Sequence, residues 1–247
     1  MVRPQFPVAL TGKEHLNENT IELQFQFINN EAFSFRAGQF VQLLFDYEGE
    51  GYKRSYSIAN SPELFEQTRT LHIAISFVEG GVASAFFSHV GVGAQMSLLG
   101  PFGVLTLPEK LSGRLVLVGT GTGIAPYRSM MPKLTHYATV STPVTIIMGG
   151  RYQHELIYLA EFEKLAQTHT NIDYRMCLSR EKSINLQQGE YSGYVQQQFK
   201  QLDLNSAADM IYLCGNPNMV DDAALELKGM QFSSKQVRRE KYVYSGH

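Results

Sequence analysis

The sequence contains few cysteines, little net charge and no long apolar run. Its 247 residues include only two cysteines, Cys177 and Cys214, far apart along the chain. Two cysteines supply neither a disulfide framework nor a cysteine-bound metal cluster, so we expect no metal site. A formal net charge of -2 argues against nucleic acid or a membrane as the main partner. Since no apolar stretch could span a bilayer and the N-terminus lacks a signal-peptide core, we expect a soluble, cytoplasmic protein with reduced thiols.

What the sequence does contain is typical of a globular protein, with 44% hydrophobic and 18% charged residues. From about residue 6 to 99, short segments alternate apolar and polar residues between turns, as in Thr20–Phe27. Several such strands favour an antiparallel barrel or sandwich. Residues 100–113 contain three glycines and two prolines, which interrupt regular structure. We place the boundary there, giving domains at 1–105 and 106–247.

The second half has a different pattern, in which strands alternate with helices. Leu115–Val118 is a continuous apolar run, typical of a parallel strand covered on both faces. Further strands are expected at 144–148, 173–178 and 210–214, and helices at about 124–134 and 154–166. This order predicts a doubly wound α/β domain whose ligand lies beyond the carboxyl ends of its strands.

A short polar strand in the first half carries groups that suit a flavin nucleotide. Alternation puts Arg54 and Tyr56 on one side of this strand, and Ser55 and Ser57 on the other. A guanidinium can hold a phosphate, and a tyrosine ring can stack on a flat heterocycle. By itself the motif fits equally well an ordinary edge strand with a surface ion pair.

Two glycines nearby strengthen the flavin hypothesis. Gly80–Gly81 precede an expected helix at 82–88, whose first N–H groups would be free to bind an anion. The same glycines would also suit a plain strand-to-helix turn. Taken together with Arg54, they favour a shared pyrophosphate site.

The glycine loop of the second half differs from the usual dinucleotide fingerprint. Residues 119–126 read G-T-G-T-G-I-A-P. If Gly121 is taken as the first glycine of the G-x-G-x-x-G fingerprint, Pro126 stands where the third glycine would fall. The next strand ends in Arg151 instead of an acidic residue, which argues against a conventional NAD site. Arg151 and Arg180, the latter preceded by Ser179, suit an additional ribose phosphate. Each alone could be a surface residue, but the pair favours NADP.

Six motifs occur in the order found in ferredoxin–NADP reductases. They are Arg54-Ser55-Tyr56-Ser57, Gly81-Val82-Ala83-Ser84, the loop Gly119 to Pro126, Ser179-Arg180-Glu181, Cys214-Gly215-Asn216-Pro217 and Glu240-Lys241-Tyr242. Over nearly its whole length the chain resembles this family. The resemblance implies a six-stranded antiparallel FAD-binding barrel followed by an NADP-binding α/β domain with a doubly wound parallel sheet.

The resemblance also implies roles for individual residues in binding FAD. Arg54 would hold the pyrophosphate, Tyr56 would stack on one isoalloxazine face, and Ser57 would lie near the flavin N5. The other implied FAD contacts are Ser55; Ile73, Ala74, Ile75 and Ser76, through their backbone; Gly81, Val82, Ala83 and Ser84, which cap the phosphates; Thr122, where the two cofactors meet; and Tyr242.

Further roles concern the dinucleotide and catalysis. Together with Ser57, the implied catalytic residues are Cys214 and Glu240, which flank the nicotinamide, and Tyr242, which covers the flavin until nicotinamide displaces it. Tyr244 is the alternative residue for covering the flavin. The implied NADP contacts are Gly121, Thr122, Gly123, Gly150, Arg151, Ser179, Arg180, Tyr194, Cys214, Gly215 and Asn216.

Two departures from the family pattern bear on specificity. Where the family often has another basic residue, this chain has Tyr194, which could stack on adenine while Arg180 and Arg151 provide selectivity for NADP. The chain also continues past Tyr242, as reductase components of oxygenases do.

The implied activity is that of a ferredoxin–NADP(+) reductase, transferring electrons between NADPH and a separate ferredoxin or flavodoxin, and we expect a monomer. An oxygenase reductase component or an NAD(P)H–flavin reductase is the alternative, and any [2Fe–2S] centre would then lie on another protein. A third hypothesis is a non-catalytic flavin-binding subunit. The joint presence of Ser57, Cys214 and Glu240 speaks against it.

Overall fold

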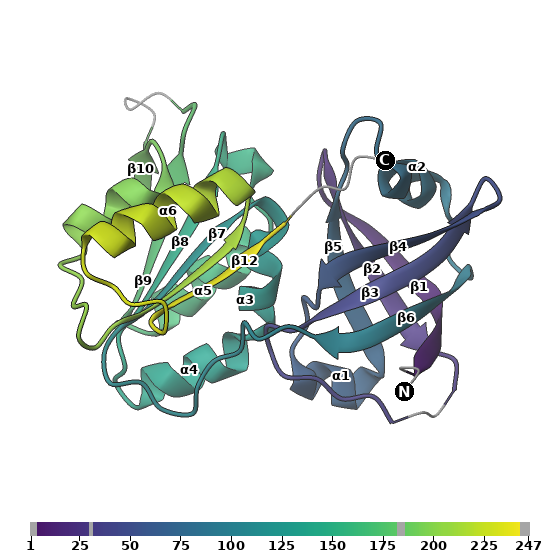
Figure 1. The fold of residues 1–247 in the computed structure, drawn as a ribbon, viewed down its shortest axis with the longest axis horizontal. Helices are drawn as coiled ribbons and strands as arrows, with labels where there is room; N and C mark the ends of the chain where they lie inside the picture. The colour runs from purple at the N-terminus through teal and green to yellow at the C-terminus, as the bar shows by residue number, and fades with distance from the viewer. Residues whose placement is uncertain (1–3, 30–31, 182–185, 243–247) are drawn as a thin grey trace. The chain divides into compact units, whose positions relative to one another are not determined.

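The computed structural model describes residues 4–29, 32–181 and 186–242 (Figure 1). The chain divides into two compact units. The first runs to Thr106 and includes the short segment Ala125–Met130, and the second contains Leu107–Ile124 and the described residues from Met131 to Tyr242. No helix within the described ranges has the length and apolar character needed to cross a membrane.

The first unit is built on a six-stranded antiparallel sheet with the order β4-β3-β6-β1-β2-β5. An antiparallel bridge between Ile58 and Ile73 joins the two outer strands, which closes the sheet into a barrel and confirms the predicted architecture. The strands are β1 (Gln5–Asn17), β2 (Thr20–Phe27), β3 (Phe40–Tyr47), β4 (Glu50–Ser57), β5 (Thr70–Ser76) and β6 (Gln95–Phe102); the helices are α1 (Pro62–Thr68), α2 (Val82–His89) and α3 (Ala125–Ser129).

The barrel core follows from the alternation of apolar residues. Ile21, Leu23 and Phe25 of β2 are fully buried, and they pack with inward residues of the other strands such as Leu43 and Leu98. Aromatic rings attach α2 to β3, because Phe45 stacks on Phe86 with ring centroids 4.6 Å apart and also meets Phe87 at 5.2 Å. Ring contacts of this kind stabilise beyond the area that they bury. Helix α2 is thereby fixed against β3, the strand that pairs with β4.

The second unit is built on a parallel six-stranded sheet with the order β10-β9-β8-β7-β11-β12, which confirms the predicted doubly wound fold. Its strands are β7 (Leu115–Thr120), β8 (Val144–Gly150), β9 (Ile172–Leu178), β10 (Glu190–Ser192), β11 (Met210–Gly215) and β12 (Val237–Lys241). Its helices are α4 (Met131–Thr139), α5 (Leu159–Thr168) and α6 (Pro217–Gly229), with the 3-10 helices η1 (Gly121–Ile124), η2 (Gln153–Glu155) and η4 (Val195–Gln201).

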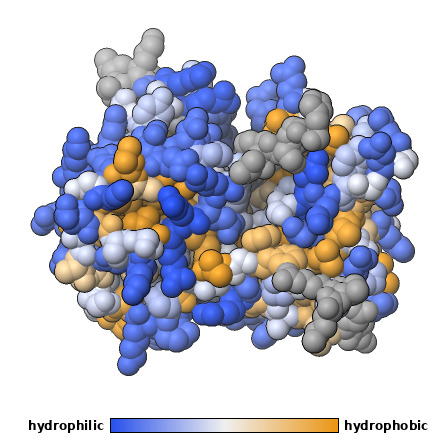
Figure 2. Space-filling view, viewed as in Figure 1, coloured by the Kyte–Doolittle hydropathy of each residue, from blue (hydrophilic) through white to orange (hydrophobic). Residues whose placement is uncertain are grey.

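Packing in this unit matches the sequence pattern. All four residues of Leu115–Val118 are fully buried, as expected for a strand covered on both faces. Val116 and Val118 belong to a core with Val220 and Leu227 of α6. Figure 2 shows that α6 is largely hydrophilic on the side seen there, as expected for a helix that covers one face of a sheet.

Two expected helices are interrupted. Instead of one helix at about 124–134, the chain forms η1, α3 and α4. Pro132 has no N–H to donate to residue 128, so a helix running through residue 130 cannot continue unbroken, and the proline is tolerated near the start of α4. The helix expected from residue 154 begins at Leu159, after the short 3-10 helix η2.

Candidate flavin and dinucleotide sites

The flavin motif lies on β4, which pairs with β3 in antiparallel register. Tyr52, Arg54 and Tyr56 are partly buried, whereas Ser55 is exposed, so the strand presents an arginine and two tyrosines on one face. The Arg54 guanidinium lies over the Tyr52 ring, 5.7 Å from its centroid, and donates a hydrogen bond to the Lys53 carbonyl. Ser57, at the end of the strand, is 5% exposed.

Tyr56 is held in a partly buried, uncharged state. Its ring meets Phe87 of α2 edge to face, with centroids 6.3 Å apart. Burial raises the pKa of the Tyr56 phenol far above its usual range, and the nearby positive charge of Arg54 opposes this only in part. The phenol therefore stays neutral well beyond the physiological pH range.

At the beginning of α2, the Gly81 N–H donates to the Val78 carbonyl at 3.0 Å, whereas the N–H groups of Val82, Ala83 and Ser84 have no partner among the described residues. Gly81 is the N-cap residue, and no side chain among the described residues caps this end of the helix. A Cβ on Gly81 would lie 3.1 Å from the Val78 carbonyl and 3.2 Å from Ser84 Oγ, so a larger residue would crowd the turn. Ser84 Oγ itself accepts a hydrogen bond from the Val78 N–H at 2.7 Å. Uncapped N–H groups, together with Arg54 in the same unit, fit a pyrophosphate.

The segment that follows the motif is tied to β5. Ile58 pairs with Ile73, and the Ala59 N–H donates to the His72 carbonyl at 2.8 Å. Beyond Ile73, no strand in the described part of the chain pairs with that edge of β5. The edge of β5 at Ala74–Ser76 therefore has no ladder partner on this side among the described strands, which fits a strand that contacts a ligand through its main chain.

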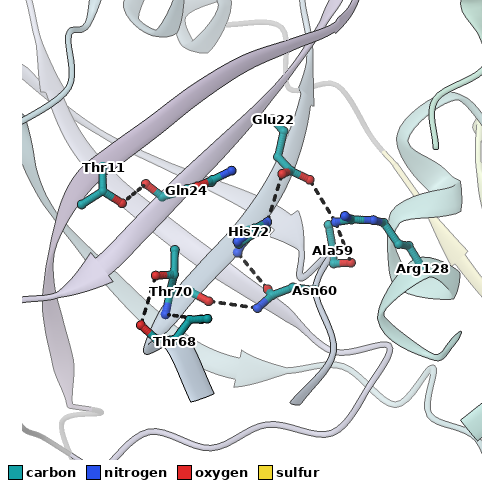
Figure 3. A network of polar contacts seen from close by, with 9 residues as sticks. All are labelled: Thr11, Glu22, Gln24, Ala59, Asn60, Thr68, Thr70, His72 and Arg128. Carbon is teal, nitrogen blue, oxygen red and sulfur yellow. Dashed lines mark hydrogen bonds and ion pairs between the residues drawn. The ribbon is translucent and has the colours of Figure 1, made fainter. Parts of the chain in front are cut away.

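A buried carboxylate, which the sequence analysis did not identify, supports this region (Figure 3). Glu22 of β2 is only 4% exposed. His72 Nδ1 lies 3.0 Å from one carboxylate oxygen, and Arg128 Nη1 of α3 lies 3.0 Å from the other. Arg128 also reaches the carbonyl of Ala59, at 3.4 Å. We refer to Glu22, His72 and Arg128 as the Glu22 cluster.

The Glu22 cluster continues into the flavin segment through Asn60. The backbone N–H of His72 donates to Asn60 Oδ1 at 2.8 Å, and Asn60 Nδ2 donates to the Thr70 carbonyl at 2.9 Å (Figure 3). Alternation places Glu22 on the outer face of β2, where a carboxylate would normally be solvated. The Arg128 side chain covers it instead, and no local sequence pattern reveals that contact.

In the second unit, two glycine turns meet at the carboxyl ends of β7 and β11. A Cβ on Gly123 would lie only 2.3 Å from the Cys214 carbonyl oxygen, and one on Gly215 would lie 2.5 Å from the Thr120 carbonyl. The Asn216 N–H donates to Thr120 Oγ1 at 3.0 Å. Glycine is required at both positions because the two backbones touch. The closely packed turns include the predicted contacts Gly121, Thr122, Gly123, Gly215 and Asn216.

The predicted catalytic residues of this unit gather at the same edge of the sheet. Cys214 is fully buried and pairs in register with Glu240 of β12. Burial raises the pKa of the Cys214 thiol well above its usual value, and the Glu240 charge adds to this, while a hydrogen bond with Tyr242 opposes it. The Tyr242 N–H donates to the Gly215 carbonyl at 2.9 Å. Tyr244 lies outside the described residues.

The ends of β8 and β9 lie side by side. The Ser179 N–H donates to the Gly150 carbonyl, and the Arg180 N–H donates to the Arg151 carbonyl, both at 3.0 Å. The Arg180 side chain is exposed, and its guanidinium forms no hydrogen bond or ion pair with another described residue. Arg151, by contrast, forms an ion pair with Glu155. Tyr194 precedes η4 and is 63% exposed.

Comparison with known proteins assigns a family to each half of the chain. Residues 7–107 match the family model described as the oxidoreductase FAD-binding domain, and residues 117–224 match the oxidoreductase NAD-binding domain. The chain is thus an oxidoreductase with a flavin domain and a nicotinamide-dinucleotide domain. It is 31% identical over 218 residues to ferredoxin–NADP reductase B of Sorangium cellulosum, covering 87% of this chain and 88% of that protein. The chain belongs to the ferredoxin–NADP reductase family.

Other relatives serve oxygenases. The chain is 28% identical over 241 residues to the toluate 1,2-dioxygenase electron transfer component of Pseudomonas putida, covering 97% of this chain and 68% of that protein. Its fold resembles that of the Amycolatopsis cytochrome P450 reductase GcoB, with a TM-score of 0.82 and 26% identity over 98% of this chain and 71% of that one. Family membership therefore establishes a flavoprotein that transfers electrons, and leaves its acceptor open.

Proposed function

We propose that this protein oxidises NADPH and passes the electrons, through FAD, one at a time to a separate ferredoxin or flavodoxin. For the coenzyme, the observation that carries the proposal is the backbone pairing of Arg151 with Arg180, which puts two basic side chains beyond neighbouring strand ends. A conventional NAD site would have an acidic residue there. For the acceptor, the support is the similarity to the Sorangium ferredoxin–NADP reductase along 88% of its length.

In this proposal, the residues of the first unit hold the flavin. Arg54 and the N–H groups of Val82, Ala83 and Ser84 would hold the pyrophosphate, Tyr56 would stack on the ring, and Ser57 would lie near its reactive nitrogen. Bound FAD would supply the redox chemistry, accepting a hydride from the nicotinamide and passing on two electrons singly. A site in which two separate elements hold one pyrophosphate fits FAD better than FMN, which has a single phosphate.

The residues of the second unit orient the dinucleotide. The Gly121–Gly123 and Gly215–Asn216 turns bind its phosphates, and Arg180 binds the 2′-phosphate. Cys214 and Glu240 position the nicotinamide, and Tyr242 covers the flavin in its absence. The buried Cys214 thiol stays protonated, so it offers the ring a neutral contact.

The test is a steady-state assay of NADPH-dependent cytochrome c reduction with and without added ferredoxin or flavodoxin. We expect reduction to depend on the added carrier, and NADPH to be a better donor than NADH. Equal rates without a carrier, together with rapid reduction of free flavin, would contradict the proposal. The flavin released by heating should elute as FAD on chromatography.

A second candidate is the reductase component of an oxygenase system. The specific observation in its favour is the match to the toluate dioxygenase electron transfer component along 97% of this chain. This candidate predicts that an oxygenase or its ferredoxin accelerates flavin reoxidation more than flavodoxin does.

A further inference from the structure

We propose that Glu155 sets the coenzyme specificity of the dinucleotide site by occupying the position on Arg151 that a 2′-phosphate would take. The proposal rests on the dinucleotide-binding part of the proposed function and names a residue that limits it. Glu155 would act as an internal competitor that keeps the preference for NADPH over NADH small.

The geometry shows a carboxylate seated in an anion site. Arg151 directly follows β8, and Glu155 ends η2, four residues later. Arg151 Nη2 lies 2.7 Å from Glu155 Oε1, and Arg151 Nε donates to Glu155 Oε2 at 3.1 Å. The Arg151 backbone N–H donates to the same Oε2 at 3.0 Å, and the Tyr152 backbone also hydrogen-bonds this carboxylate. A two-pronged guanidinium contact supplemented by backbone N–H groups is how proteins bind phosphate oxygens.

The pair is fully charged at neutral pH. Partial burial by itself would raise the pKa of Glu155, but hydrogen bonds from the side chain and backbone of Arg151, and its charge, lower it below its usual value. The same hydrogen bond raises the pKa of Arg151. Glu155 therefore cancels the positive charge that Arg151 would offer to a phosphate, and it would itself repel one.

Arg151 and Arg180 differ in their ionic partners. The two arginines are joined through their backbones, yet within the described residues only Arg151 has an anionic partner. The Arg151 side chain is 54% exposed and that of Glu155 is 23% exposed, so solvent and a ligand can reach the pair. Exposed ion pairs are weak, which means that a phosphate could displace the carboxylate. Removal of the Glu155 charge should then strengthen binding of a 2′-phosphate by about five- to twentyfold.

The test measures binding of 2′,5′-ADP and 5′-ADP to the full-length, FAD-loaded protein by titration calorimetry. Neither probe has a nicotinamide, so the result does not depend on hydride transfer or on the electron acceptor. In Glu155→Gln, we expect the dissociation constant for 2′,5′-ADP to fall by about five- to twentyfold, while that for 5′-ADP changes less than about twofold. The gain should disappear in the double variant Glu155→Gln/Arg151→Ala.

Asp203→Asn is a matched control for net charge. Asp203 is an exposed acidic residue after η4 with a positive φ of 47°, a conformation that asparagine accepts readily. The Asp203→Asn variant should leave the dissociation constants for 2′,5′-ADP and 5′-ADP unchanged. Weaker binding of 2′,5′-ADP to Glu155→Gln would overturn the inference, because Glu155 would then position Arg151 for the phosphate. An unchanged ratio, or a gain that survives loss of Arg151, would overturn it as well.

The binding result for the two ADP probes can be interpreted whether or not the proposed function is correct. If the protein preferred NADH or failed to reduce ferredoxin, the proposed function would be wrong, but the ratio of the two ADP constants would still report on Glu155. If the ratio failed to change while NADPH-dependent reduction of ferredoxin was observed, only the Glu155 inference would be lost.

Discussion

The Glu22 cluster offers a quantitative test of how the first unit holds its flavin segment. The change is Arg128→Met, which keeps much of the side-chain length and removes the guanidinium. Glu22, with its side chain 5% exposed, would then keep its contact with His72 but lose the guanidinium that balances its charge. Removal of one member of a buried ion pair typically costs about 3–5 kcal/mol, because the other charge stays buried. The Arg128 side chain is 18% exposed, so we expect the low end of that range, about 3 kcal/mol.

A double variant separates the stranded charge from lost packing. In Glu22→Gln/Arg128→Met both charges are gone, and the amide can still hydrogen-bond His72. We therefore expect it to be more stable than Arg128→Met and within about 1 kcal/mol of the wild type. The exposed Arg36 belongs to the same unit, and the control Arg36→Met should change stability by less than about 0.5 kcal/mol.

The assay is urea unfolding of the FAD-loaded protein, followed by the rise in flavin fluorescence on release. That signal reports on the unit that contains β4 and β5. Arg128→Met should also release FAD faster under native conditions, because the guanidinium reaches the Ala59 carbonyl just after the flavin motif. If Arg128→Met matched the wild type, or if the double variant were less stable than either single one, the cluster would not stabilise the unit as argued.

Four further predictions concern individual residues. Arg180→Ala should raise the NADPH KM about tenfold to a hundredfold and leave the NADH KM nearly unchanged; equal loss for both coenzymes would make Arg180 structural. Tyr242→Ser should lower the NADH KM and slow turnover through slower NADP release. An unaltered flavin difference spectrum on titration with NADP would refute the hypothesis that the Tyr242 ring covers the flavin. Burial raises the pKa of Cys177 to about 12 and also raises that of Cys214, so neither thiol should react with a thiol reagent near neutral pH until the protein unfolds. Because the Cys177 pKa is raised in the fold, its contribution to stability should be lost as pH rises from about 9 towards 12, and stability that is flat over this range would contradict its burial.

Much of the fold was predictable because its signals are local. The alternation in Thr20–Phe27 gave a strand with the same bounds in the structure, and the apolar run Leu115–Val118 lies in the buried strand β7. Both patterns express how a strand divides its side chains between faces. The break between α3 and α4 was less obvious, since the apolar spacing around it suits one helix, yet Pro132 marks it.

The candidate sites were only partly predictable from the sequence. The motif residues around Arg54 and Gly123 were identifiable because their chemistry and spacing are local. The Glu22–Arg128 contact joins residues 106 positions apart, and no periodicity in one sequence reports such a pair. The four-residue spacing of Arg151 and Glu155 can be read from the sequence. Only the structure shows that η2 brings the Glu155 carboxylate into contact with both the guanidinium and the backbone N–H of Arg151. Sequence alone suggests two free arginines, whereas the structure has one free and one paired among its described residues.

The most direct test of the central claim is a rapid-mixing experiment on the FAD-loaded protein without oxygen. Mixing with NADPH should bleach the flavin absorbance, and faster than NADH does. Subsequent mixing with oxidised ferredoxin or flavodoxin should restore the absorbance as two equivalents of carrier are reduced. If NADPH left the flavin oxidised, or if neither carrier restored the absorbance, the chain would not be the NADPH-dependent electron-transfer enzyme proposed for it.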